Sequence, residues 1–232
     1  RNSFTVSFYS TRFANAYNPF TGIFDRKAGD TSFLRTLGVS IALGKQLRWP
    51  DDYFTLVYSL NFTQYKLRNY PNLFPGLNNT TAHNLSLKLA LSRSSVDPPI
   101  FPRSGSSFMA SVQATPPYSL IDPKRVNSAN PYELPEFHKW RFTGEWYVPI
   151  GRPMGADRSR QFVLKAAAKY GFMGRYTSKL DYSPFERFQV GDAGLTNNFG
   201  VLGYDIIAHR GYPVYQTSNV NVNPDLSQAQ FF

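Results

Sequence analysis

The sequence contains no cysteine among its 232 residues. Disulfide frameworks, thiolate metal sites and cysteine nucleophiles are therefore excluded. It also contains no apolar run that approaches the roughly 20 residues needed by a membrane-spanning helix, which excludes a helical membrane protein. The sequence begins with Arg1 instead of Met and carries no signal peptide, so we expect it to start within a longer protein.

Acidic residues are scarce, because 15 Asp and Glu stand against 25 Lys and Arg, which gives a formal charge of +10. A charge of this size favours nucleic acid, anionic lipid headgroups or a cationic lumen. The basic residues are spread along the chain, and no zinc-finger, RRM or basic-helix pattern accompanies them. We therefore expect no nucleic-acid binding.

Residues that support catalysis are also sparse. His83, His138 and His209 fall on different expected elements and lack the spacing of metal ligands. Strand alternation places no Ser, His and acid together on one surface, as a serine hydrolase requires. We expect no enzymatic activity, no metal and no cofactor.

What the sequence has is an aromatic content of 16% and repeated alternation of apolar and polar residues. Alternation with period two is typical of β-strands. Seven segments show it: residues 3–10, 36–44, 54–63, 84–92, 107–114, 139–148 and 162–172. In the last segment a helix around the three alanines is the alternative, but the alternating lysines and Gly171 favour a strand.

The connections between these segments alternate in length. Long polar connections at residues 11–33, 68–80, 115–136 and after 173 alternate with shorter ones at 45–52, 93–105 and 151–160. Long loops at one end and tight turns at the other are typical of outer-membrane barrels. A soluble β-sandwich, with one face in water, is the alternative that alternation alone leaves open.

Aromatic residues near strand ends favour the membrane barrel, because such barrels carry aromatic girdles at both interfaces. The residues expected there are Tyr53, Tyr65, Trp140, Tyr147, Tyr170 and Phe172. Charged residues must then face the lumen, because Lys or Arg facing lipid at the midplane costs about 2–4 kcal/mol. The expected lumen-lining charges are Lys88, Lys139, Arg141, Glu145, Lys165 and Lys169.

Seven strands do not close a membrane barrel, for which eight is the smallest known number, and an open edge in hydrocarbon leaves backbone groups unpaired. We therefore expect further strands outside this sequence. The predicted fold is all-β, a transmembrane antiparallel β-barrel segment.

The segment 184–215 departs from the alternating pattern and is expected to be a long, irregular loop. Phe185, Phe188 and Gly191 are spaced by two residues each, and Arg210-Gly211-Tyr212 follow. These elements resemble the sixth extracellular loop of the BamA family, the central subunit of the β-barrel assembly machinery, whose wider family includes two-partner secretion translocators.

Two further segments support the resemblance. Residues 97–105, with Phe101, Pro102 and Gly105, look like a periplasmic turn of the family, and residues 146–150 look like the strand end one hairpin later. The overall character of the sequence resembles that of Bacteroidetes-type members of the family. Two positions depart from the family pattern: His209 replaces the hydrophobe before Arg210, and Asp192 replaces a second glycine.

The resemblance implies that residues 1–232 are part of one C-terminal sixteen-stranded barrel domain, from about its fifth strand through the sixth extracellular loop at about 179–232. The POTRA repeats and closing strands are expected outside this sequence. In such a loop the Arg210 guanidinium would pin the loop to luminal acids on later strands, because it presents a planar fork to carboxylates. Gly211 would permit close backbone approach.

The resemblance also implies a function, namely the folding and insertion of barrel proteins into the outer membrane of a Gram-negative bacterium. The expected partners are unfolded outer-membrane proteins, accessory lipoproteins and outer-membrane lipid. A two-partner-type secretion translocator and a porin-like diffusion channel are the alternatives, because a barrel fold alone does not decide function.

Overall fold

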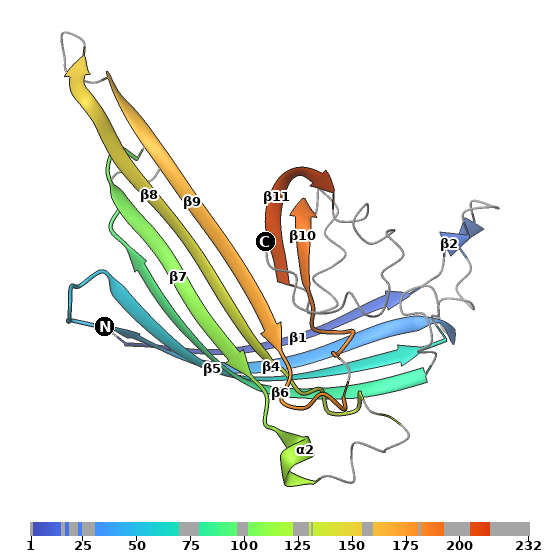
Figure 1. Cartoon of the computed structure of the whole chain (residues 1–232). Coiled ribbons are helices and arrows are strands. Elements are labelled where there is room, and N and C mark those ends of the chain that lie inside the picture. Colours follow the sequence, from blue (N-terminus) through green and yellow to red (C-terminus); the bar gives the residue numbers. More distant parts are fainter. Residues whose placement is uncertain are drawn as a thin grey trace.

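The computed structural model describes residues 2–14, 17–18, 23–24, 31–69, 79–96, 102–122, 130, 132–154, 160–180, 182–192 and 205–213. Seven antiparallel strands form one curved sheet in which each strand pairs with the next along the chain (Figure 1). They are β1 (Asn2–Ala14), β4 (Phe33–Gln46), β5 (Phe54–Arg68), β6 (Asn79–Ser94), β7 (Gly105–Ala114), β8 (His138–Met154) and β9 (Arg160–Gly174). The prediction of seven strands and an all-β class is confirmed, including a strand at the three alanines.

The remaining elements are short. Strands β2 (Tyr17–Asn18) and β3 (Ile23–Phe24) pair with each other, and α2 (Tyr118–Ile121) lies between β7 and β8. Strands β10 (Phe188–Asp192) and β11 (Asp205–Pro213) form a separate parallel pair. In the part of the chain that the structure describes, no helix has the length and apolarity required to cross a membrane.

The register of the sheet keeps the alternating pattern in phase across all seven strands. Ile41 on β4 lies opposite both Val6 on β1 and Leu60 on β5. Because side chains in register across a sheet share a face, one face carries an apolar band from β1 to β9. The other face is polar.

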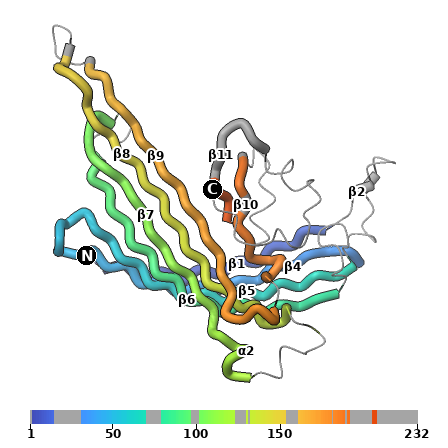
Figure 2. The backbone as a smooth tube through the Cα atoms, in the orientation of Figure 1, coloured from blue at the N-terminus to red at the C-terminus, as the bar shows by residue number. Residues whose placement is uncertain are grey.

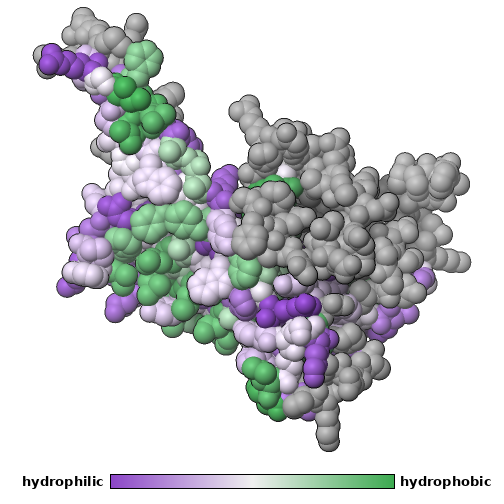
Figure 3. All heavy atoms as spheres, in the orientation of Figure 1, coloured by the Kyte–Doolittle hydropathy of each residue, from purple (hydrophilic) through white to green (hydrophobic). Residues whose placement is uncertain are grey.

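The apolar face is the convex one, and its large side chains remain exposed. Phe8 and Phe162 are each 69% exposed, and Leu43 is 54% exposed. Figure 3 shows hydrophobic residues gathered over β8 and β9. An exposed apolar face that continues across seven strands marks a surface that contacts lipid or another protein.

The aromatic girdle prediction is wrong for two of its six residues. Tyr65 is only 2% exposed and lies on the concave face, in register with Thr36 and Ala82. Tyr147 also lies on the concave face, where its hydroxyl donates to Glu145 Oε2 over 2.8 Å. Both follow from alternation, because odd-numbered positions of β5 and β8 point inward.

The segment 184–215 was predicted to be irregular, and this is also wrong, because it contains β10 and β11. Val190 of β10 pairs in parallel with Ile207 of β11. Parallel neighbours are separated by a crossover connection, so neither strand has a local hairpin signal that the sequence could reveal.

Candidate functional site: an anchored segment on the concave face

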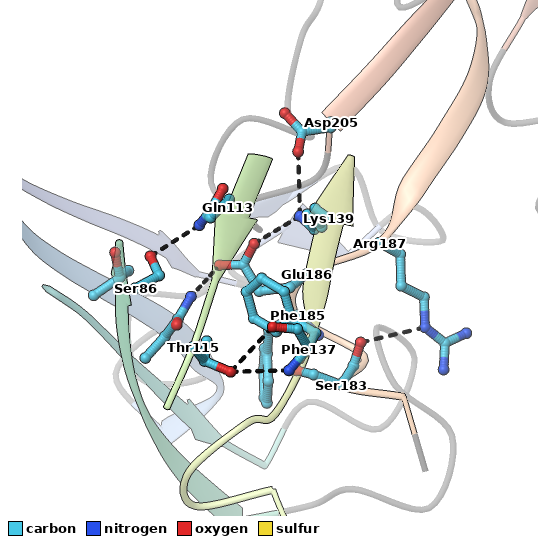
Figure 4. Close-up of polar contacts among 12 residues, drawn as sticks. Ser86, Gln113, Thr115, Phe137, Lys139, Ser183, Phe185, Glu186, Arg187 and Asp205 are labelled. Atoms are coloured by element: carbon cyan, nitrogen blue, oxygen red, sulfur yellow. Dashed lines mark hydrogen bonds and ion pairs between the residues drawn. The ribbon is translucent and has the colours of Figure 1, made fainter. Parts of the chain in front are cut away.

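Residues 182–188 and residues 205–207 at the start of β11 lie on the concave side of the seven-stranded sheet (Figure 2). Residues 183 to 186 are all buried there. The chain turns locally at Ser183, whose hydroxyl accepts a hydrogen bond from Phe185 N over 3.3 Å. The turn directs the side chains of Phe185 and Glu186 towards the sheet (Figure 4).

Glu186 is the centre of the contact between this segment and the sheet. Its Oε1 accepts hydrogen bonds from the Tyr65 hydroxyl over 2.8 Å and from Asn84 Nδ2 over 2.7 Å. Its Oε2 accepts one from Lys139 Nζ over 2.9 Å. One carboxylate is therefore bound by β5, β6 and β8 together, which fixes the segment to three strands of the wall.

A second carboxylate completes the cluster. Asp205, the first residue of β11, lies 3.2 Å from Lys139 Nζ and 3.6 Å from Arg141 Nη1. Two acids and two bases balance in charge, and the Lys139 side chain is only 3% exposed. A buried ammonium requires such compensation, because an unpaired buried charge is strongly unfavourable.

Aromatic rings pack around the charges. The rings of Tyr65 and Phe185 stack with centroids 5.1 Å apart and an interplanar angle of 9°. Lys139 Nζ lies 5.3 Å from the ring centroid of Phe137 and 5.6 Å from that of Phe188. Cation–π contacts of this kind stabilise a desolvated ammonium further.

Gly171 on β9 provides the space that β10 and β11 occupy. A Cβ at this position would lie 2.7 Å from Ile207 Cδ1 and 3.1 Å from Phe188 Cε1. A larger side chain at Gly171 would therefore displace the two strands from the wall. Gly191, with φ of 144°, permits the bend at which the pairing of β10 with β11 shifts register.

Asn84 shows how strongly the cluster is specified. A carboxylate only accepts hydrogen bonds, so the Asn84 amide must direct Nδ2 towards Glu186. Its Oδ1 is then buried without a partner among the described residues. Asn84 therefore makes a hydrogen bond to the charged carboxylate while its own carbonyl oxygen accepts none among the described residues.

A smaller cluster supports the connection between β7 and β8. The Glu136 carboxylate accepts hydrogen bonds from the backbone N–H and the hydroxyl of Ser119, and Tyr176 OH donates to Thr115 O over 2.9 Å. Burial raises the pKa of Tyr176, and the nearby Glu136 carboxylate raises it further. The hydroxyl is therefore held protonated as a donor.

The six charges predicted to line the lumen all occupy inward positions of their strands, as the register places them. Lys139 and Arg141 join the Glu186 cluster, whereas Lys165 and Glu145 form a separate, more exposed pair with 3.0 Å between Nζ and Oε1. Lys88 and Lys169 take no part in the Glu186 contacts described above. Within the described residues, no group of three or more His, Cys, Asp or Glu side chains is arranged to hold a metal ion.

The predicted loop residues divide into two groups. Phe185 and Phe188 lie at the anchor, as described above. Arg210, Gly211 and Tyr212 lie in β11, but their side chains fall outside the described part of the structure. Their role stays a prediction.

Glu186, Asp205, Tyr65 and Asn84 were not predicted from the sequence as partners in this site. One signal was present: strands β1, β4, β5 and β6 contain no Asp or Glu, so an acid that meets their inner face must come from another segment. Alternation also placed Tyr65 and Asn84 on the polar face. The pairing itself spans 121 and 102 residues and has no local signature.

A curved antiparallel sheet with a lipid-type convex face and a polar concave face holding an anchored segment defines the wall of a transmembrane β-barrel with a luminal loop. Residues 1–203 match the model of the Omp85 superfamily domain. The chain belongs to the Omp85 superfamily of outer-membrane β-barrel proteins.

One similar solved structure is that of BamA from Haemophilus ducreyi lacking POTRA domains 1-3, with a TM-score of 0.50 and 16% sequence identity. The match covers 82% of this chain and 37% of that chain, so the sequence spans little more than a third of its relative. None of the curated proteins is significantly similar in sequence. The structural match supports the partial barrel fold. The predicted resemblance to a BamA-type barrel segment is confirmed.

Proposed function

We propose that the full protein folds and inserts β-barrel proteins into the outer membrane of a Gram-negative bacterium. Membership of the Omp85 superfamily supports this proposal. The observation that carries it furthest is the anchoring of the segment 183–192 on the concave face through Glu186. A barrel used for free diffusion needs an open lumen, whereas this wall holds a folded segment against it.

In this proposal the seven strands contribute the rigid back of the barrel. The substrate strand would pair with an exposed strand edge at the seam, which is β-augmentation used as a template for folding. The seam strands belong to the rest of the barrel. The anchored segment stiffens the wall opposite the seam, because it ties β5, β6 and β8 to one carboxylate.

The proposed partners are unfolded outer-membrane proteins, accessory lipoproteins and the surrounding outer-membrane lipid. No catalytic chemistry is part of the proposal.

Depletion of the protein in its native host tests the function. We expect the folded, heat-modifiable forms of other outer-membrane barrels to decline while their unfolded precursors accumulate in the periplasm. Complementation with the wild-type gene controls for indirect loss. Normal barrel assembly in depleted cells would rule out the assembly function.

Secretion of a dedicated polypeptide is the second candidate, because Omp85 membership is compatible with either activity. The full open reading frame discriminates between them. Several POTRA repeats before the barrel favour assembly, and two favour secretion. The absence of POTRA repeats favours a diffusion channel.

A further inference from the structure

Basic residues meet on the convex face at the ends of β1, β4 and β5 that join the long connections. Arg12 lies directly opposite Arg35, and Arg35 lies directly opposite Lys66. These three side chains are exposed, and Arg68 follows on the same face of β5. We call Arg12, Arg35, Lys66 and Arg68 the basic row.

Arg35 and Lys66 lie directly opposite each other in the row and repel each other. Like charges directly opposite each other on neighbouring strands destabilise a sheet. Strands β1, β4, β5 and β6 contain no Asp or Glu that could alternate with these bases. An anion bound between the side chains would turn the repulsion into attraction.

The surface between the bases is hollowed. Arg35 and Lys66 line two adjoining shallow grooves, one shared with Arg68 and Thr81 and the other with Arg12 and Phe33. The Arg12 guanidinium lies over the Phe33 ring, 4.6 Å from its centroid. A stacked guanidinium is pre-oriented, so it loses less freedom when it binds an oxyanion.

The position of the row relative to lipid follows from β4. Leu37, Val39, Ile41 and Leu43 lie on the convex face between Arg35 and Lys45. The strand rises about 33 Å between these two bases, which at a tilt of about 40° gives an apolar band about 25 Å tall, the height found in outer-membrane barrels. Arg35 therefore lies at one membrane interface and Lys45 at the other.

Long loops of such barrels are extracellular, so the basic row lies at the interface of the outer leaflet. We infer that the basic row binds the phosphate groups of lipopolysaccharide, the phosphorylated glycolipid of that leaflet. The inference rests on the proposed outer-membrane location. Guanidinium and ammonium groups donate to phosphate oxygens, while the acyl chains lie along the apolar band below.

Native mass spectrometry of the full-length protein in detergent tests the inference with three probes: phosphorylated lipid A, lipid A with its phosphates removed, and phosphatidylglycerol. The test variant is Arg35→Gln with Lys66→Gln. The matched control is Lys45→Gln with Lys179→Gln, which removes the same charge from exposed sites elsewhere. Circular dichroism and heat-modifiability verify that each variant is folded.

We expect wild type and control to retain phosphorylated lipid A and the test variant to lose about tenfold in affinity for each lost charged contact. Removal of the phosphates from lipid A should have the same effect as the test variant. Equal retention by test and control variants would overturn the inference, as would equal binding of dephosphorylated lipid A or of phosphatidylglycerol. Because this readout is lipid binding, the site stands or falls separately from the assembly activity measured by depletion.

Discussion

Lys139 Nζ and Glu186 Oε2 lie 2.9 Å apart, and their side chains are only 3% and 7% exposed. The pair joins strand β8 to the segment that precedes β10. Both charges are removed from water. Removal of one member of the pair therefore destabilises the structure strongly, because the other charge is left buried without compensation. Glu186 is therefore the residue whose replacement should release the segment.

Glu186→Gln should weaken docking of the segment by about 2 kcal/mol or more, because Lys139 then retains only Asp205 as an acidic partner. Ser183→Cys supplies the probe, in a full-length background whose cysteines outside residues 1–232 are replaced, since Ser183 is 2% exposed and residues 1–232 contain no cysteine. Faster labelling of this thiol in full-length protein reports release. Glu145→Gln, which breaks a more exposed pair with Lys165, is the control and should leave labelling unchanged.

Tyr65 contributes a hydrogen bond and a stacked ring, and two variants separate these contributions. Tyr65→Phe removes only the donor to Glu186 and should weaken docking by about 1.5–3 kcal/mol, typical of hydrogen bonds to charged groups. Tyr65→Ala also removes the stacking on Phe185 and should cost more. Equal labelling of Ser183→Cys in both backgrounds would show that the ring contributes nothing.

Gly171→Leu tests the steric part of the anchor without altering a charge. The new side chain would meet Ile207 and Phe188, so β10 and β11 should move away from β9. Ala167→Leu is the matched control, since Ala167 occupies an exposed inward position of the same strand. Protease cleavage between β10 and β11 should increase for the first variant alone.

Arg210→Glu tests the anchor predicted from the loop motif. If an acid on a later strand of the full barrel binds Arg210, charge reversal should release the loop and reversal of that acid should restore it. Combining Arg210→Glu with Glu186→Gln shows whether the two anchors act independently, because independent sites have additive effects. If reversing the charge of each luminal acid in turn fails to restore docking of the loop, Arg210 has no acidic partner in the lumen.

The sequence predicts the sheet well because each strand carries its own signal. Period-two alternation assigns inward and outward faces, and antiparallel hairpins then fix the neighbours. The same rule placed Lys139 and Arg141 on the inner face before any contact was known. The same rule argues against Tyr65 as a girdle residue, because odd-numbered positions of β5 point inward even near the end of the strand.

The anchor is harder to predict, because it depends on how a nonlocal segment meets the wall. Glu186 pairs with Lys139 across 47 residues, and nothing near Glu186 specifies that lysine over Lys88 or Lys169. Strands β10 and β11 are likewise defined by pairing across a long connection. Each of these elements could pair with several others. The sequence alone therefore does not show which partner it meets in the folded protein.

The span of the Glu186 contacts also sets an order for the protein's own folding. Glu186 lies 121 residues after Tyr65 and 102 after Asn84, so its partners are brought together only when the strands from β5 to β8 have already paired. Until then its carboxylate is better hydrated by water than buried, and contacts between such distant residues form late. Docking of this segment therefore requires that this part of the sheet has already formed, which places it late in the folding of the described chain.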